Sequence, residues 1–176
     1  MATIIGRQNE MSELRKYIDS DKAEFIAIYG RRRVGKTFLV REMFKDKFVF
    51  EVSGTIGGKK NEQMFNFLQA LHRYGYDGTE TPTTWNAAFN LLQQLLEKKA
   101  ETQKCILFMD ELPCFDTPKA DFVRAFDHFW NGWASHYPNI KLIVCGSATS
   151  WMVENIIDNH GGLHNRITHE IHLRPF

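Results

Sequence analysis

The chain has 176 residues, of which 24% are charged and 43% hydrophobic, and its net charge is +1. This length suits a single domain with a sizeable core. The balanced charge excludes the strong whole-chain field that marks polyanion-binding proteins, and no apolar run reaches the ~18 residues of a membrane span.

Helical and strand patterns alternate along the chain. Apolar residues recur at helical spacing over 8–20, and the apolar run 25–29 predicts a first buried strand. We expect a helix over 38–44, a strand over 47–52, helices over 61–74 and 84–99, and a strand over 104–109. Pro118 is expected to open a helix that ends near His136, before a strand over 140–145, a short helix over 150–158 and a strand over 167–173. This alternation predicts an α/β fold, with a parallel sheet covered by helices on both faces.

A phosphate-binding motif lies between the first strand and its helix. The pattern G-x-x-x-x-G-K-[ST] is matched by Gly30, Arg31, Arg32, Arg33, Val34, Gly35, Lys36 and Thr37. A strand that feeds a glycine-rich turn and then a helix directs several backbone N–H groups at one spot, where the helix dipole adds positive potential. We therefore expect a nucleotide polyphosphate at residues 30–38, Phe38 included.

Two side chains of this motif carry specific roles. Lys36 is expected to place its ammonium between the β- and γ-phosphates, and Thr37 to offer its hydroxyl to Mg²⁺. The three arginines are expected to serve the nucleotide or local acids rather than DNA.

A second motif follows the strand over 104–109. Its apolar run ends in Asp110 and Glu111, the Walker B pattern, at the sheet edge where ligands bind in open α/β folds. Asp110 would hold Mg²⁺, and Glu111 would orient or deprotonate the attacking water. The alternative is a strand that ends in a solvated acidic turn.

A third strand, 142–145, also ends in small polar residues. Ser147, or else Thr149, would touch the γ-phosphate or its water if this strand lies between the other two. The alternative role for these residues is helix N-capping, and both roles are compatible.

Cysteines and histidines add little chemistry. Cys105 and Cys145 lie inside apolar runs, which predicts reduced thiols and a cytoplasmic location. His160, His164, His169 and His172 gather near the end of the chain without the spacing typical of zinc ligands, so we expect no metal there.

Together these motifs resemble the P-loop ATPases that have an extra strand between the two motif-bearing strands. Within that superfamily the chain resembles the AAA-type ATPases found largely in archaea and some bacteria, which are close to the STAND ATPases and the initiator-type AAA+ proteins. The matching segments are 5–10 (IGRQNE), 29–37 (YGRRRVGKT), 109–111 (MDE), 145–147 (CGS), and Arg166 with 171–176 (IHLRPF).

The resemblance implies a three-layer sandwich with strand order 5-1-4-3-2. It places Arg7 on the adenine side of the site, and it makes Arg166 an arginine finger or phosphate sensor, with a structural salt bridge as the alternative. Family members continue into a helical lid and further domains, so residues 1–176 are expected to be one core domain without its lid. We expect such a core to bind nucleotide weakly and to turn over slowly.

Two functions fit these residues. The first is a Mg²⁺-dependent ATPase that acts as a nucleotide-driven switch. The second is a nucleotide-binding regulatory module of a DNA-linked assembly, with little hydrolysis. The expected partners are ATP or ADP, and a second copy of the chain or downstream domains. DNA is expected only through those domains, and no membrane is expected.

Overall fold

The computed structural model describes residues 6–157 and 167–176. Its centre is one five-stranded sheet whose neighbouring strands all run parallel, in the order β2-β3-β4-β1-β5. The strands are β1 (Glu24–Tyr29), β2 (Phe48–Ser53), β3 (Cys105–Asp110), β4 (Ile140–Gly146) and β5 (His169–His172). Read from the other edge this is the order 5-1-4-3-2, so the predicted P-loop sandwich is confirmed.

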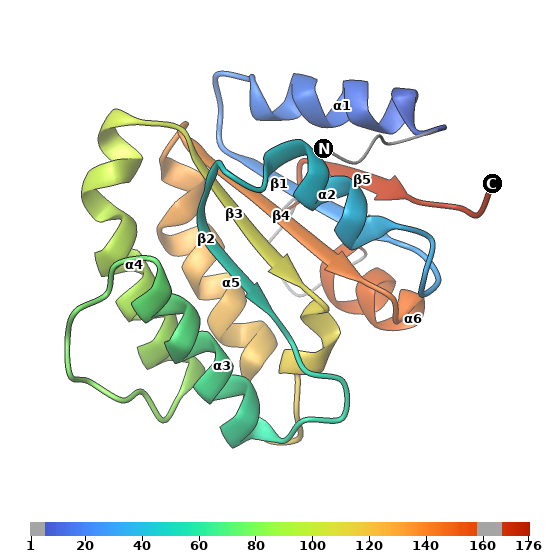
Figure 1. The fold of residues 1–176 in the computed structure, drawn as a ribbon. Coiled ribbons are helices and arrows are strands. Elements are labelled where there is room, and N and C mark those ends of the chain that lie inside the picture. The colour runs from blue at the N-terminus through green and yellow to red at the C-terminus, as the bar shows by residue number, and fades with distance from the viewer. Residues whose placement is uncertain (1–5, 158–166) are drawn as a thin grey trace.

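Helices cover both faces of the sheet (Figure 1). α1 (Gln8–Ile18) and α2 (Lys36–Phe44) pack on one face, and α3 (Lys60–Arg73), α4 (Trp85–Thr102) and α5 (Phe122–Gly132) pack on the other. α6 (Thr149–Met152) follows β4 and continues into a π-helical turn, Val153–Ile157, while short 3₁₀ turns span Leu112–Phe115 and Ala134–His136. Among the helices described, none is both long and apolar enough to cross a bilayer.

The central strands are apolar on both sides because both of their faces are covered. In β1, Ile26 and Ile28 face α1 and α2, whereas Phe25 and Ala27 face the aromatic-rich cluster under α4 and α5. All four side chains are buried. This double burial explains why the strands appear in the sequence as continuous apolar runs rather than as alternating patterns.

The helix predicted between Pro118 and His136 is present as α5, but its predicted start at Pro118 is wrong. A turn closed by the Ala120 N–H on the Thr117 carbonyl, at 3.2 Å, precedes α5, and Lys119 and Asp121 have positive φ angles of 61° and 56°. These left-handed residues interrupt the helical path, so α5 begins only at Phe122. It ends at Gly132, and a separate 3₁₀ turn follows at 134–136.

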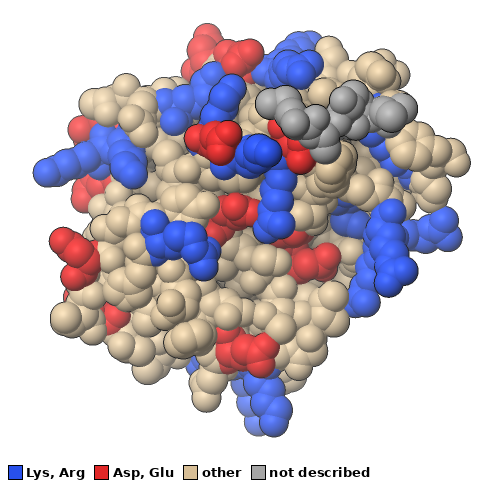
Figure 2. Space-filling view, viewed as in Figure 1, with Lys and Arg blue, Asp and Glu red and all other residues tan. Residues whose placement is uncertain are grey.

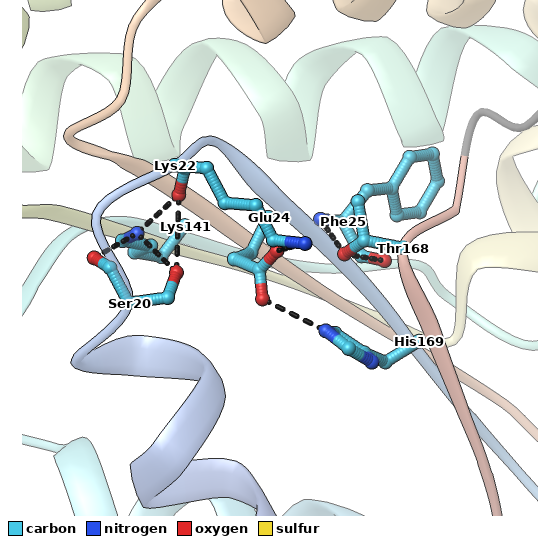
Figure 3. A network of polar contacts seen from close by, with 7 residues as sticks. All are labelled: Ser20, Lys22, Glu24, Phe25, Lys141, Thr168 and His169. Carbon is cyan, nitrogen blue, oxygen red and sulfur yellow. Dashed lines mark hydrogen bonds and ion pairs between the residues drawn. The ribbon is translucent and has the colours of Figure 1, made fainter.

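A polar cluster joins the loop after α1 to the sheet, at the end opposite the phosphate loop (Figure 3). The Lys141 ammonium is buried and donates to the Ser20 carbonyl at 2.9 Å, to the Ser20 hydroxyl at 3.0 Å, and to the Lys22 carbonyl. Beside it, His169 of β5 lies 2.9 Å from the buried Glu24 carboxylate of β1. The cluster therefore connects β4, β1 and β5 to the α1–β1 loop.

Candidate functional site

The phosphate loop runs from the end of β1 to the start of α2, as the sequence predicts. The Leu39 N–H is the first to bond within the helix, to the Gly35 carbonyl at 2.9 Å. The N–H groups of residues 35–38 therefore have no intrahelical acceptor. Four such donors at the positive end of a helix dipole form a site for an anion.

Lys36 lies inside this loop. It is 4% exposed, and its ammonium donates to the carbonyls of Gly30 and Arg31, at 2.8 Å each. Burial lowers the pKa of Lys36, and the nearby carboxylates of Asp110 and Glu111 oppose that shift. A cation is thus held at the centre of the loop, and no carboxylate of residues 6–157 or 167–176 is bonded directly to it.

Thr37 and Asp110 bring the first and second motifs together. The Thr37 hydroxyl donates to Asp110 Oδ2 at 2.6 Å, and the Glu111 N–H donates to Asp110 Oδ1 at 2.9 Å. Asp110 is 4% exposed, and burial raises its pKa despite these two hydrogen bonds. A hydroxyl and a carboxylate are ligands that suit Mg²⁺, so this pair fits the predicted metal position.

Glu111 lies just beyond β3 with a left-handed φ of 50°. The Ser147 hydroxyl donates to its Oε1 at 3.4 Å. Burial and the charge of Asp110 raise the pKa of Glu111, while Lys36, the Ser147 hydrogen bond and Arg32 lower it. A half-buried carboxylate with a raised pKa, beside a phosphate loop, can accept a proton from a water molecule.

The capping role predicted as an alternative for Ser147 and Thr149 is wrong. The N-cap of α6 is Ala148, without a side-chain cap, and Thr149 is the first helical residue. Ser147 instead points its hydroxyl toward Glu111, because β4 lies between β1 and β3.

A pocket of about 360 Å³ joins the predicted residues. Its lining is Arg32, Arg33, Gly35, Lys36, Thr37, Phe38, Glu111 and Ser147.

Arg166, His160 and His164 lie outside the described residues. His169 and His172 stack on different tyrosines, Tyr17 and Tyr29. Among residues 6–157 and 167–176, no three His, Cys, Asp or Glu side chains gather in the manner of a metal cluster.

Gly54 supports the site but escaped the sequence analysis. Its N–H donates to the Asp110 carbonyl at 2.9 Å, and a Cβ at Gly54 would lie 2.6 Å from the Glu111 carbonyl oxygen. Any side chain there would displace the Asp110–Glu111 corner. The available signal was the small pair Ser53-Gly54 at the end of a strand, which becomes informative only when β2 is known to pair with β3.

Arg7 lies beside the loop, yet its guanidinium is already bonded to protein groups. It donates to the carbonyls of Val34 and Arg174 and stacks on Phe176. The predicted contact between Arg7 and the adenine stays a prediction.

Residues 4–176 match the family described as an ATPase domain predominantly from Archaea. The chain belongs to this archaeal ATPase family. The match agrees with the family that the two motifs and the opening Gly6-Arg7 suggested, and with nucleotide binding as the general property of the domain.

This ATPase domain is similar to an uncharacterised protein of Methanocaldococcus jannaschii, with 26% identity over 97% of the chain and 36% of that relative. Among solved structures it resembles a Walker-type ATPase of Pyrococcus abyssi (TM-score 0.67, 18% identity, 98% of this chain and 54% of that one). It also resembles the ORC2 protein of Aeropyrum pernix, solved as ADPNP and ADP complexes (TM-score 0.62, 18% identity, 97% and 48%). The chain thus spans between about a third and about half of these relatives, and the structural likeness shows the fold.

Proposed function

We propose that this domain binds ATP with Mg²⁺, hydrolyses it, and acts as a nucleotide-driven switch. The observation that carries the proposal is the 2.6 Å hydrogen bond from the Thr37 hydroxyl to Asp110. It lies beside the phosphate loop, whose carbonyls also hold Lys36. Part of the phosphate loop, Thr37 and the candidate base Glu111 line one pocket, and Asp110 is bonded to Thr37 beside it.

Binding would require Lys36 to change its hydrogen-bond partners. The N–H groups of residues 35–38, which have no intrahelical acceptor, would receive phosphate oxygens, and Lys36 would exchange the carbonyls of Gly30 and Arg31 for the β- and γ-phosphates. Thr37 and Asp110 would hold Mg²⁺, which would neutralise phosphate charge. Arg31, Arg32 and Arg33 add positive charge around the same oxygens.

Hydrolysis would depend on Glu111. Its carboxylate would orient a water molecule in line with the γ-phosphate and accept a proton from it, while Ser147 holds the carboxylate in place. Arg166, by its resemblance to the arginine that precedes the last strand in the family, would act as a finger or sensor.

The test separates binding from hydrolysis. Lys36→Ala should raise the Kd for ATP at least roughly tenfold, since it removes the buried cation of the loop. The exposed Lys45, on the same side of the sheet, gives a matched control, and Lys45→Ala should leave the Kd unchanged. Equal affinity of wild type and Lys36→Ala in calorimetry would disprove the phosphate site.

Glu111→Gln should retain ATP and lose roughly 100-fold or more in single-turnover rate, because a base acts mainly in the transition state. The exposed Glu101→Gln serves as the control and should hydrolyse at the wild-type rate. Hydrolysis by Glu111→Gln at the wild-type rate would exclude Glu111 as the base.

A regulatory nucleotide-binding module with little hydrolysis is the second candidate. The observation in its favour is the engagement of Lys36 by Gly30 and Arg31, because the loop must exchange two hydrogen bonds before the ammonium reaches phosphate. Single-turnover assays with and without Mg²⁺ distinguish the two functions. The module would bind nucleotide and show the same negligible turnover in both conditions.

A further inference from the structure

The Arg7 guanidinium connects two segments that are far apart in sequence. Arg7 is 7% exposed, and its Nη2 donates to the Val34 carbonyl at 3.2 Å and to the Arg174 carbonyl at 2.8 Å. Its Cζ lies 4.1 Å from the centre of the Phe176 ring, and Glu10 is 3.6 Å away. Hydrogen bonds to carbonyls and a ring face satisfy a buried guanidinium well. The contact is therefore built into the fold.

The segment after β5 also contacts the start of the phosphate loop. The Leu173 N–H donates to the Tyr29 carbonyl at 2.8 Å, and a Cβ at Gly30 would lie 2.2 Å from the Leu173 carbonyl oxygen. Leu173 therefore contacts the beginning of the phosphate loop directly. Arg174 and Phe176 contact Arg7, which in turn holds Val34 near the end of the loop.

The hydrogen bond from Arg7 to the Val34 carbonyl fixes the direction of the Val34–Gly35 peptide group. Val34 lies between Arg33 and Gly35, whose φ angles are 66° and 98°. The Val34–Gly35 peptide is trans, so its carbonyl and its N–H point in opposite directions. When Arg7 holds the Val34 carbonyl, the Gly35 N–H must face away from Arg7. Gly35 lines the nucleotide pocket.

We propose that Arg7 is a positioning residue for the phosphate loop. By holding the Val34 carbonyl, Arg7 directs the Gly35 N–H toward the place of a phosphate oxygen. Because Arg7 is itself held by Arg174 and Phe176, nucleotide affinity then depends on residues 174–176. The proposal rests on the proposed nucleotide site. It gives Arg7 a role through the Val34 carbonyl, separate from any contact with the base.

The geometry favours arginine over lysine. One guanidinium nitrogen, Nη2, donates to both carbonyls, while Nη1 lies 3.6 Å from Glu10 and the planar group lies against Phe176. A lysine ammonium is a single point charge without a planar face, so Arg7→Lys retains the charge and loses the second nitrogen and the flat face. The matched control is Arg15→Lys, because Arg15 is exposed on α1, the helix that begins just after Arg7, and has no side-chain partner among residues 6–157 and 167–176.

The experiment measures ADP affinity by calorimetry and the Gly35 amide resonance by NMR without nucleotide. Arg7→Lys should raise the Kd roughly tenfold, the usual size of a lost charge-assisted hydrogen bond, and should shift the Gly35 amide. Thermal unfolding verifies that the variant is folded. Arg15→Lys should change neither quantity. A general loss of stability would lower the unfolding midpoint without a selective shift of the Gly35 amide.

Wild-type affinity in Arg7→Lys, or an unmoved Gly35 amide, would overturn the proposal. If the wild-type domain itself binds no ADP, the proposed function fails. The Gly35 resonance and the hydrogen exchange of amides 33–36 would then still decide whether Arg7 holds the loop.

Discussion

Asp110 is a carboxylate that the fold buries at a cost to stability. Because burial raises its pKa above the unfolded value, the ionised form is disfavoured in the folded protein. The cost is absent below the unfolded pKa, grows as pH rises through the folded pKa, and is fully present above it. Such a residue is retained for what it binds.

Asp110→Asn should therefore raise the unfolding free energy at pH 7, by on the order of 1 kcal/mol, because the asparagine side chain carries no charge to desolvate. The asparagine can accept from the Glu111 N–H and donate to the Thr37 hydroxyl. The gain should shrink as the pH falls toward 4.5, and the effect of Mg²⁺ on ATP binding should disappear.

Urea unfolding between pH 4.5 and 7.5 measures the gain. Asp46→Asn, on the exposed turn after α2, is the control and should change stability by less than about 0.5 kcal/mol at any of these pH values. A variant at Asp110 that is less stable than wild type at pH 7 would show that its hydrogen bonds outweigh its burial.

At the scale of elements, two lysines tie the end of α1 to the starts of different strands. Lys141 is buried and bonds to Ser20 and Lys22, whereas Lys104 forms a 2.9 Å ion pair with Asp19 in which the side chains are 43% and 73% exposed. An exposed ion pair contributes little, but loss of a buried charged donor leaves its acceptors unpaired.

Lys141→Met should thus lower the unfolding free energy by about 1–3 kcal/mol, and Lys104→Met by less than about 0.5 kcal/mol. Chemical denaturation of the two variants gives the comparison. Equal losses would mean that burial of the Lys141 ammonium offsets the gain from its hydrogen bonds.

At the scale of the whole molecule, nucleotide should stabilise the fold by mass action. With ADP at about 100 times its Kd, linkage gives about 2.7 kcal/mol, and a domain of this size gains about 2–4 °C in Tm per kcal/mol. We expect a rise of about 5–10 °C that Lys36→Ala abolishes. The same rise in Lys36→Ala would indicate that nucleotide binds elsewhere.

Charged side chains of both signs lie on the surface of the domain. Figure 2 shows lysines and arginines among aspartates and glutamates over much of the face seen in Figure 1, and a group of basic side chains at its right edge. A nucleic-acid surface typically gathers basic side chains in a stripe or patch.

The sequence by itself determined the phosphate loop and the two acids. Lys36, Thr37, Asp110 and Glu111 are identifiable because each follows a buried apolar run, and the carboxyl ends of parallel strands meet at one edge of the sheet. The resemblance then supplied the strand order, which is what brings Ser147 beside Glu111. Local patterns of this kind determine an element and the residue at its end.

Only the tertiary structure decided the long-range contacts that hold the site and the rest of the fold. Arg7 and Arg174 are 167 positions apart, and Lys141 and Ser20 are 121 apart, so no local periodicity can pair them. α5 starts late because Lys119 and Asp121 have left-handed backbone, and the presence of Pro118 in the sequence does not predict this conformation. Such features are selected by packing between distant segments, and packing is settled only when the whole chain is folded.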